Sequence, residues 1–328
     1  MRPLDRGPAL SADRNVTAPS APAADDQEED SVSLRKKLMV APGTRVRLKD
    51  VDAAFHGDYA SSEHARADLA ANVARLAELQ QKLYGERKHA LLVVLQGIDA
   101  AGKDGTCWHV MAAMNPQGTS VHGFKQPTEE ERLHDFLWRV HPFAPGLGQV
   151  AVFNRSHYED VLVVRVHDLV PKEVWSARYE LINDFEKMLT RSGVTILKFF
   201  LYITPEEQLE RFRQRLDDPA RQWKISEADY KERAFWDQYI AAYEDMLEKC
   251  STPHAPWYVI PSNHKWFRNL AVSKIIEDTL DDMKLKLPDP TVDLDQIRRD
   301  YHAALAEDPA AAPLIAKGER KLAGNDGA

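Results

Sequence analysis

The chain has 328 residues, of which 44% are hydrophobic and 29% are charged, and its formal net charge at pH 7 is −8. That suits one large globular domain or two small ones, and it argues against general polyanion binding, so a polyanion site would need Lys and Arg gathered locally. No apolar run approaches the roughly 20 residues that span a bilayer, and the N-terminus lacks the apolar core of a signal peptide. Two cysteines, Cys107 and Cys250, cannot form a disulfide framework, so we expect a reducing, cytoplasmic setting.

The N-terminal part of the chain divides into two segments. Residues 1–35 are rich in Ala, Pro, Asp and Ser, a composition that predicts a disordered leader. Residues 36–89 form an N-terminal segment in which 63–84 carries apolar side chains at helical spacing, which predicts a helix that packs on the core. These side chains are Leu69, Val73, Leu76, Leu79 and Leu83.

Residues 90–287 are predicted to form the core, because strand and helix patterns alternate there. The strands are expected at 91–96, 119–124, 149–153, 194–203 and 257–260. The helices are expected at 103–114, 128–141, 172–190, 205–217, 226–249 and 265–284. Such alternation predicts an α/β fold with a parallel sheet covered on both faces, and ligands bind at the carboxyl ends of such strands. Residues 288–328 are expected to be a tail with one short helix near 294–306.

The first expected strand runs into a glycine-punctuated loop and then into the start of a helix. Gly97, Gly102 and Lys103 fit the pattern GxxxxGK, in which main-chain N–H groups, the helix dipole and a lysine charge bind phosphates. An ordinary glycine turn is the alternative, and the flanking strand and helix argue against it. The predicted phosphate-binding residues are Gly97, Ala100, Ala101, Gly102, Lys103, Asp104 and Gly105.

One position departs from the general pattern. The residue after the lysine is usually a Ser or Thr whose hydroxyl binds magnesium, but here it is Asp104. A hard cation prefers carboxylate oxygen, so we predict that Asp99, inside the loop, binds Mg²⁺.

A second polar group follows the strand expected at 149–153. Because that strand should run beside the phosphate-loop strand, the segment from Asn154 to Asp160 should face the phosphates. Arg155 can bind phosphate oxygens through its fork of donors, and Asp160 can share the metal with Asp99. Asn154 and Glu159 are expected at the acceptor or at metal-bound water. A polar turn that caps the next helix is the alternative, and His157 is expected to be a packed histidine rather than a base.

A third group is a cluster of cations within residues 208–234, interrupted by Asp217-Asp218-Pro219. It predicts a basic lid, which would neutralise charge and exclude water during phosphoryl transfer. A solvated helix face is the alternative. The residues expected to bind a phosphate chain are Arg211, Arg215, Lys224 and Arg233, with Arg213 and Arg221 nearby. The aromatic side chains between Trp223 and Trp266 are expected mostly in the core.

Together these motifs resemble the type-2 polyphosphate kinases. The matching stretches are Gly97–Thr106, Phe136–His141, Phe153–Leu162 and Ala255–Pro261. The similarity extends from about residue 38 to about residue 287, and Asn154 and Glu159 match the class that handles both AMP and ADP.

The resemblance implies a P-loop kinase fold of the thymidylate-kinase type, with a helical lid over a tunnel for inorganic polyphosphate. It implies reversible, magnesium-dependent phosphoryl transfer between polyphosphate and AMP or ADP, forming ADP and ATP, with Mn²⁺ as a substitute metal. It places Asp99 and Asp160 at the metal, Lys103 in the phosphate loop and Arg155 beside the transferring phosphate. It also implies a homodimer or homotetramer, and no nucleic-acid or membrane partner is expected.

Two other functions fit parts of the pattern. One is an ATP-dependent nucleoside or nucleotide kinase of the same fold, and the other is a non-catalytic polyphosphate-binding module. Asp99, Lys103 and Asp160 argue against the module, because binding alone would tolerate the loss of metal carboxylates.

Overall fold

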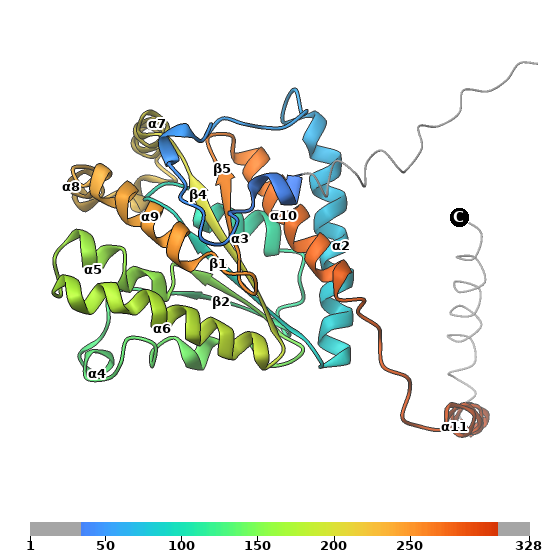
Figure 1. The fold of residues 1–328 in the computed structure, drawn as a ribbon. Helices are drawn as coiled ribbons and strands as arrows, with labels where there is room; N and C mark the ends of the chain where they lie inside the picture. Colours follow the sequence, from blue (N-terminus) through green and yellow to red (C-terminus); the bar gives the residue numbers. More distant parts are fainter. Residues whose placement is uncertain (1–33, 308–328) are drawn as a thin grey trace, which may run out of the picture.

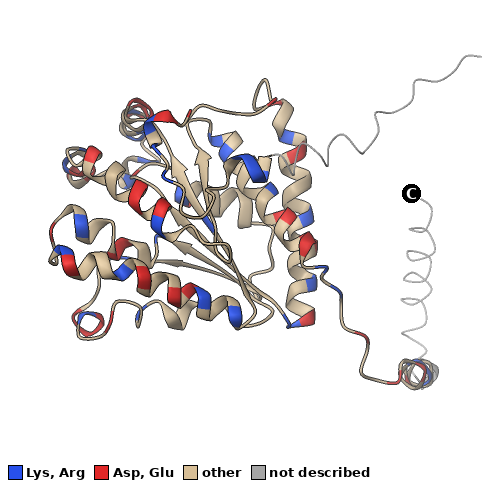
Figure 2. Ribbon diagram, viewed as in Figure 1, with Lys and Arg blue, Asp and Glu red and all other residues tan. Residues whose placement is uncertain are grey.

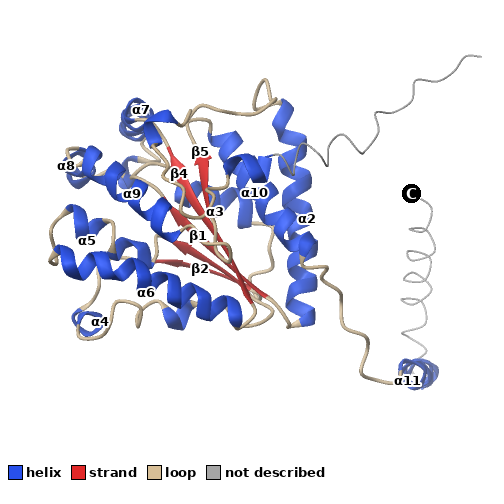
Figure 3. Cartoon of the chain, viewed as in Figure 1, coloured by secondary structure: helices blue, strands red, loops and turns tan. Residues whose placement is uncertain are grey.

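The computed structural model describes residues 34–307. Within that range, parallel strands form one sheet in the order β2-β3-β1-β4-β5 (Figures 1 and 3). The strands are β1 (Ala90–Gln96), β2 (Thr119–Gly123), β3 (Val150–Asn154), β4 (Val194–Tyr202) and β5 (Trp257–Pro261). The expected parallel α/β fold is therefore confirmed. Most of the expected leader and the end of the expected tail lie outside the described residues.

The sheet is centred on β1, whose residues are all buried. A continuous apolar run is typical of a parallel strand that is covered on both faces. β1 pairs with β3 on one side and with β4 on the other, so that Leu95 lies opposite Asn154 and Gln96 lies opposite Phe200. The carboxyl ends of these three strands therefore meet at one edge of the sheet.

Helices cover both faces of the sheet (Figure 1). One face carries α2 (His64–Glu86), α3 (Lys103–Met111) and α10 (Lys265–Asp282), and its core includes Leu76, Val93 and Ile275. The other face carries α5 (Val163–Val166), α6 (Lys172–Arg191) and α9 (Trp236–Cys250), and its core includes Phe153, Ile182 and Met246. Charged residues of both signs lie along the outer helices, whereas the strands are almost free of them (Figure 2).

The remaining elements lie at the edges of this arrangement. They are η1 (Leu48–Asp50), α4 (Glu129–Arg132), η2 (His141–Phe143), η3 (His157–Asp160), α7 (Pro205–Asp217), η4 (Gln222–Lys224), α8 (Glu227–Arg233) and α11 (Leu294–Glu307). The expected lid corresponds to α7, η4 and α8.

The helix expected at 128–141 was wrong. Only α4 forms there, because Thr128 and Glu131 make a capping box and the carboxylate of Asp135 then accepts hydrogen bonds from the N–H groups of Leu137 and Trp138. A side chain that bonds nearby main-chain N–H groups in this way favours a turn over a helix.

The helix expected at 226–249 is interrupted between α8 and α9. Phe235 has φ −97° and ψ 17°, outside the helical range, and its ring packs against His167 with centroids 4.8 Å apart. The packing of one aromatic ring therefore outweighs the helical pattern of the sequence. The helix expected at 103–114 is also shorter, because α3 ends at Met111.

Candidate active site

The phosphate loop connects β1 to α3, and its glycines are required by close packing. A Cβ atom on Gly97 would lie 2.7 Å from the carbonyl oxygen of Leu201, and one on Gly102 would lie 1.8 Å from Nη1 of Arg268. Gly102 also has φ +109°, which L-residues with side chains rarely adopt. The sequence pattern GxxxxGK thus corresponds to a tightly packed turn that ends at the N-terminus of α3.

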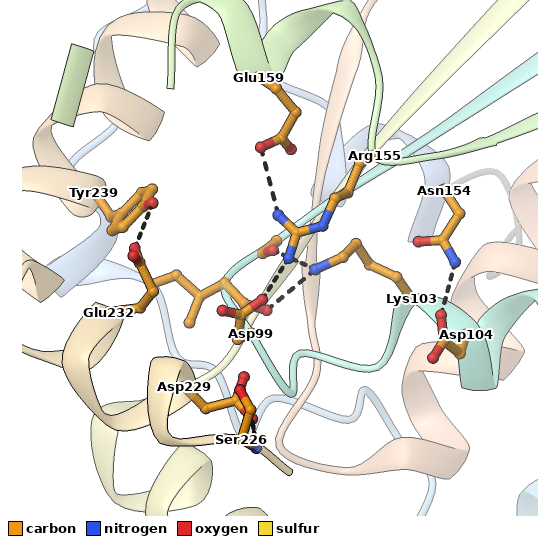
Figure 4. Close-up of polar contacts among 12 residues, drawn as sticks. Asp99, Lys103, Asp104, Asn154, Arg155, Glu159, Ser226, Asp229, Glu232 and Tyr239 are labelled. Carbon is orange, nitrogen blue, oxygen red and sulfur yellow. Dashed lines mark hydrogen bonds and ion pairs between the residues drawn. The ribbon is translucent and has the colours of Figure 1, made fainter. Parts of the chain in front are cut away.

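Lys103 lies inside this loop (Figure 4). Its Nζ donates to the carbonyl oxygens of Gly97, at 2.6 Å, and Ile98, at 3.3 Å. Burial lowers the pKa of Lys103 to about 8, with a further lowering by Arg155 that the nearby carboxylates oppose. The ammonium group is therefore held where an anion on the loop would meet it.

Arg155 connects the segment after β3 to the phosphate loop (Figure 4). Its guanidinium lies 2.5 Å from Oδ1 of Asp99 and 3.4 Å from Oε2 of Glu159. Its φ of 63° is uncommon for a residue with a side chain, and its N–H donates to the carbonyl of Leu95 in β1. The sheet register therefore holds this arginine at the loop.

The electrostatics around the loop favour the ionised forms of Asp99 and Arg155. Burial alone would raise the pKa of Asp99, but Lys103 and Arg155 outweigh it and lower that pKa below its usual value. The carboxylate of Glu159 raises the pKa of Arg155, against the effect of burial. Asp99 is therefore a carboxylate near neutral pH.

Asn154 and Asp104 form a second connection between β3 and the loop. Nδ2 of Asn154 donates to Oδ1 of Asp104 at 2.7 Å, and Nζ of Lys224 in the expected lid lies 4.0 Å from Oδ2. Asp104, at the position usually held by Ser or Thr, thus lies between the sheet and the lid.

Asp160 points into different surroundings from Asp99. Its carboxylate accepts a hydrogen bond of 2.9 Å from Nη1 of Arg178 in α6. Burial raises the pKa of Asp160 to about 6, although Arg178 and Arg139 lower it. It lines a cavity of about 240 Å³ that Asp99 does not line. The metal site that these two carboxylates were expected to share stays a prediction.

Arg155 lines three cavities. A small one of about 30 Å³ is also lined by Asp99 and Tyr239. The second is the cavity lined by Asp160, together with Glu159 and apolar side chains such as Phe124. The largest is a cleft of about 980 Å³ between the loop, the lid and α10. The cations that line the large cleft are Lys103, Lys125, Arg155, Arg211, Arg215, Arg221, Lys224, Lys265 and Arg268. An acidic chain has therefore gathered positive charge at one place.

The lid cations differ in their surroundings. Nη1 of Arg215 donates to the carbonyl of Lys224, and both side chains line the large cleft. Arg233 instead donates to the carbonyl of Pro205 and to Oε1 of Gln208, whose amide donates to the carbonyl of Asp99. Arg233 therefore connects the lid to the phosphate loop through Gln208.

Arg211, which we expected to bind the phosphate chain, lines the large cleft, but protein groups already engage its guanidinium. Only 4% of Arg211 is exposed, and it pairs with Glu207. Its other donors bind the main-chain carbonyls of Ala100, Ala101, Ser262 and Asn263. Because these carbonyls occupy the guanidinium, Arg211 holds the back of the phosphate loop in place.

His157 and the aromatic side chains are mostly packing residues. His157 is 1% exposed, and its Nε2 lies 3.3 Å from Glu186, which forms a fully buried ion pair with Lys198. Trp257 is also fully buried. Trp223 departs from the expectation, since 77% of it is exposed.

Arg268 was not among the expected site residues. This residue of α10 is 2% exposed, and its Nη1 donates to the carbonyl of Ala101 in the loop. One feature of the sequence could have pointed to it. Arg268 lies near the start of the helix that follows β5, and that helix begins at the same sheet edge as the phosphate loop.

The site was tested for its fit to a divalent metal. Within residues 34–307, no group of three or more His, Cys, Asp and Glu side chains could hold a metal ion by itself. Magnesium in kinases is bound by one or two carboxylates together with substrate phosphates. The ionised carboxylate of Asp99 fits that chemistry.

The chain was compared with known proteins. A family model described as polyphosphate kinase 2 matches residues 59–288. An AMP/ADP-polyphosphate phosphotransferase of Meiothermus ruber is 48% identical over 259 residues, which cover 78% of this chain and 96% of the relative. An ADP-polyphosphate phosphotransferase of Rhodopseudomonas palustris is 41% identical over 268 residues, which cover 78% and 93%. The crystal structure of polyphosphate kinase 2 from Arthrobacter aurescens matches with a TM-score of 0.79 and 43% identity, over 84% of this chain and 97% of that one. In the described part of the chain, no helix has the length and apolar character to cross a membrane.

Proposed function

Because the chain belongs to the polyphosphate kinase 2 family, we propose that it transfers the terminal phosphoryl group of inorganic polyphosphate to AMP and to ADP, and that the transfer is reversible. The observation that carries this assignment is the meeting of a wide basic cleft with a smaller cavity at Arg155. A polyanionic chain suits the cleft, and a nucleotide suits the cavity. Acceptance of both AMP and ADP is supported by the similarity to the Meiothermus relative.

The reaction needs no covalent enzyme intermediate. A terminal phosphate oxygen of the nucleotide forms a bond to the end phosphorus of polyphosphate, and the bond from that phosphorus to the bridging oxygen breaks. The shortened polyphosphate leaves with the electron pair. Charge spreads over the transferring group during this step, so catalysis rests on positioning and on positive charge.

The residues around the loop have separate roles in this proposal. Lys103 and Arg155 bind the transferring phosphoryl group and stabilise its charge, and the main-chain N–H groups from Gly102 to Gly105 bind the adjacent phosphates. Arg215 and Lys224 bind the polyphosphate chain further along the cleft. Glu159 orients Arg155 through their ion pair.

We assign the magnesium of this reaction to Asp99, with substrate phosphates as the other ligands. When bound, the metal neutralises phosphate charge. Asp160 was also expected at the metal, and its contact with Arg178 supports a second role in shaping the nucleotide cavity. We keep both assignments as hypotheses, together with substitution by Mn²⁺ and assembly into a dimer or tetramer.

The test is one incubation of the full chain with polyphosphate, MgCl₂ and AMP in the absence of ATP, with ADP and ATP resolved over time. We expect ADP to form first and ATP to follow. The Lys103→Ala protein, purified in the same way, controls for contaminating kinases. If ADP forms only when ATP is the donor, the chain is an ATP-dependent kinase; if polyphosphate binds without transfer to either nucleotide, the chain is a binding module.

A further inference from the structure

Arg268 carries a buried positive charge without an acidic partner. Its Nε and Nη2 donate to Oδ1 of Asn269 at 3.1 and 2.8 Å, and its Nη1 donates to the carbonyl of Ala101 at 3.3 Å. All these acceptors are neutral. Within residues 34–307, no carboxylate forms an ion pair with it, whereas the neighbouring Arg211 has Glu207 at 2.6 Å.

Such a charge is costly to bury. Taking a guanidinium out of water costs free energy that a paired carboxylate normally offsets. Burial lowers the pKa of Arg268 to about 9, and the charge of Arg211 lowers it further. Asn269 supplies hydrogen bonds to the guanidinium but no opposite charge. An anion in the adjoining cleft would supply that charge.

The guanidinium lies directly behind the phosphate-binding turn. A Cβ on Gly102 would lie 1.8 Å from Nη1 of Arg268, and a Cβ on Gly105 would lie 3.1 Å from Nη2. These two glycines flank Lys103 at the N-terminus of α3, the end of a helix that attracts anions. Arg268, which also lines the large cleft, therefore adds its charge to the end of α3.

We propose that Arg268 is a positioning residue for the phosphate chain: it fixes the loop through the carbonyl of Ala101, and its unpaired charge strengthens anion binding at the N-terminus of α3. The proposal rests on the proposed function, because it takes the large cleft as the site of the polyphosphate. It also explains why the residue beside Arg268 is Asn269, since an aspartate there would cancel the charge.

The decisive variant is Asn269→Asp. Asp and Asn have the same shape, and Oδ1 can still accept both hydrogen bonds from Arg268, so the packing is retained while the positive charge is neutralised. The probe is tripolyphosphate, whose binding to the full chain is measured by calorimetry at several salt concentrations without nucleotide. Gln117→Glu is the control, because it makes the same change in net charge at an exposed position before β2, away from the carboxyl end of the sheet.

We expect Asn269→Asp to bind tripolyphosphate roughly tenfold more weakly than the parent does at low salt. The difference in affinity should narrow at higher salt, because salt screens the interaction between charges. Its melting temperature should equal or exceed that of the parent, because the arginine gains an ion pair. Gln117→Glu should bind like the parent. Arg268→Gln should show the same loss of affinity as Asn269→Asp, since it also removes the charge.

Two results would separate the possible failures. If Asn269→Asp folds and binds tripolyphosphate as tightly as the parent, Arg268 is a structural residue only, and the inference fails while the proposed function stands. If the parent itself neither binds tripolyphosphate nor makes ADP from polyphosphate, the proposed function fails first.

Discussion

The amide of Asn154 donates a hydrogen bond of 2.7 Å to the carboxylate of Asp104. The two residues come from the end of β3 and the start of α3, and they pair because the sheet register brings those ends together. Asn154 was expected at the acceptor. The hydrogen bond makes position 154 sensitive to charge, because an aspartate there would face the carboxylate of Asp104.

Asn154→Asp should weaken polyphosphate binding more than Asn154→Ala does. Two carboxylates at this distance repel each other and place additional negative charge beside the phosphates. We expect the KM for polyphosphate to rise several-fold at low salt, and the rise to be smaller at high salt, which screens the added charge. Equal KM values for the Asp and Ala variants at all salt concentrations would show that charge at position 154 does not matter.

Lys103→Met should nearly abolish turnover and yet stabilise the fold at neutral pH. The pKa of Lys103 is 10.5 in the unfolded chain and about 8 in the folded protein. The folded residue therefore loses its proton at a lower pH than the unfolded one. The cost of burying the charge is therefore fully present below pH 8 and disappears as the pH rises to 10.5.

We expect the free energy of unfolding of Lys103→Met to exceed that of the parent by on the order of 1 kcal/mol at pH 7. This gain is net of the loss of a hydrogen-bond donor to the carbonyls of Gly97 and Ile98. Urea unfolding of both proteins at pH 7, 8, 9 and 10 measures it. A parent that is more stable than the variant at pH 7 would contradict this prediction.

Asp99→Asn should raise the magnesium concentration needed for half-maximal activity by about tenfold or more, because it removes the ionised carboxylate of the phosphate loop. Asp160→Asn tests whether the second predicted ligand acts at the same metal. If Asp160 binds the same metal, the Asp160→Asn variant also needs more magnesium for half-maximal activity. If Asp160 shapes the nucleotide cavity, the KM for AMP rises while the magnesium titration stays like that of the parent.

Arg215→Ala combined with Lys224→Ala should weaken polyphosphate binding far more than AMP binding. The affinity of a long polyanion depends on several cations acting together and falls steeply with salt, roughly in proportion to the phosphates contacted. The double variant should therefore also show a flatter dependence of the polyphosphate KM on salt. Equal losses for both substrates, with unchanged slopes, would assign these residues to a solvated helix face.

Arg211→Met should act on stability instead. Removing this guanidinium leaves main-chain carbonyls of the phosphate loop and of the segment after β5 without donors, and leaves Glu207 unpaired. We expect a loss of about 2–4 kcal/mol in the free energy of unfolding. Lys265→Met, which removes another cation of the same cleft, is the control and should change stability much less.

The sequence predicted best those features that depend on neighbours in the chain. The apolar run of β1, the glycines of the loop and the lysine at the start of α3 form one local pattern, and the order of strands and helices followed from periodicity. The helix expected at 128–141 failed for a local reason too, because Asp135 bonds nearby N–H groups and ends the helical pattern.

Other features depend on residues far apart in the chain and left no local pattern. Arg211 and Arg215 look alike in the sequence, but only Arg211 meets the carbonyls of Ala100 and Asn263 and becomes buried. Arg268 lies far from the phosphate loop in sequence, and the absence of a carboxylate around it depends on the packing of α10 against α3. Such differences become apparent only when the surroundings of each side chain are known.

The pairing of Leu95 with Asn154 also bears on how this chain can be altered. The strands β1 and β3 are linked by α3, β2 and α4, but their relative position is fixed by ladder hydrogen bonds and not by the length of that connection. Residues can therefore be inserted at the exposed positions 115–117 before β2 or 146–147 before β3, both at the amino edge of the sheet, without displacing Arg155 from Asp99. These positions suit a reporter peptide, whereas a single added residue inside β3 would turn Arg155 toward the opposite face of the sheet.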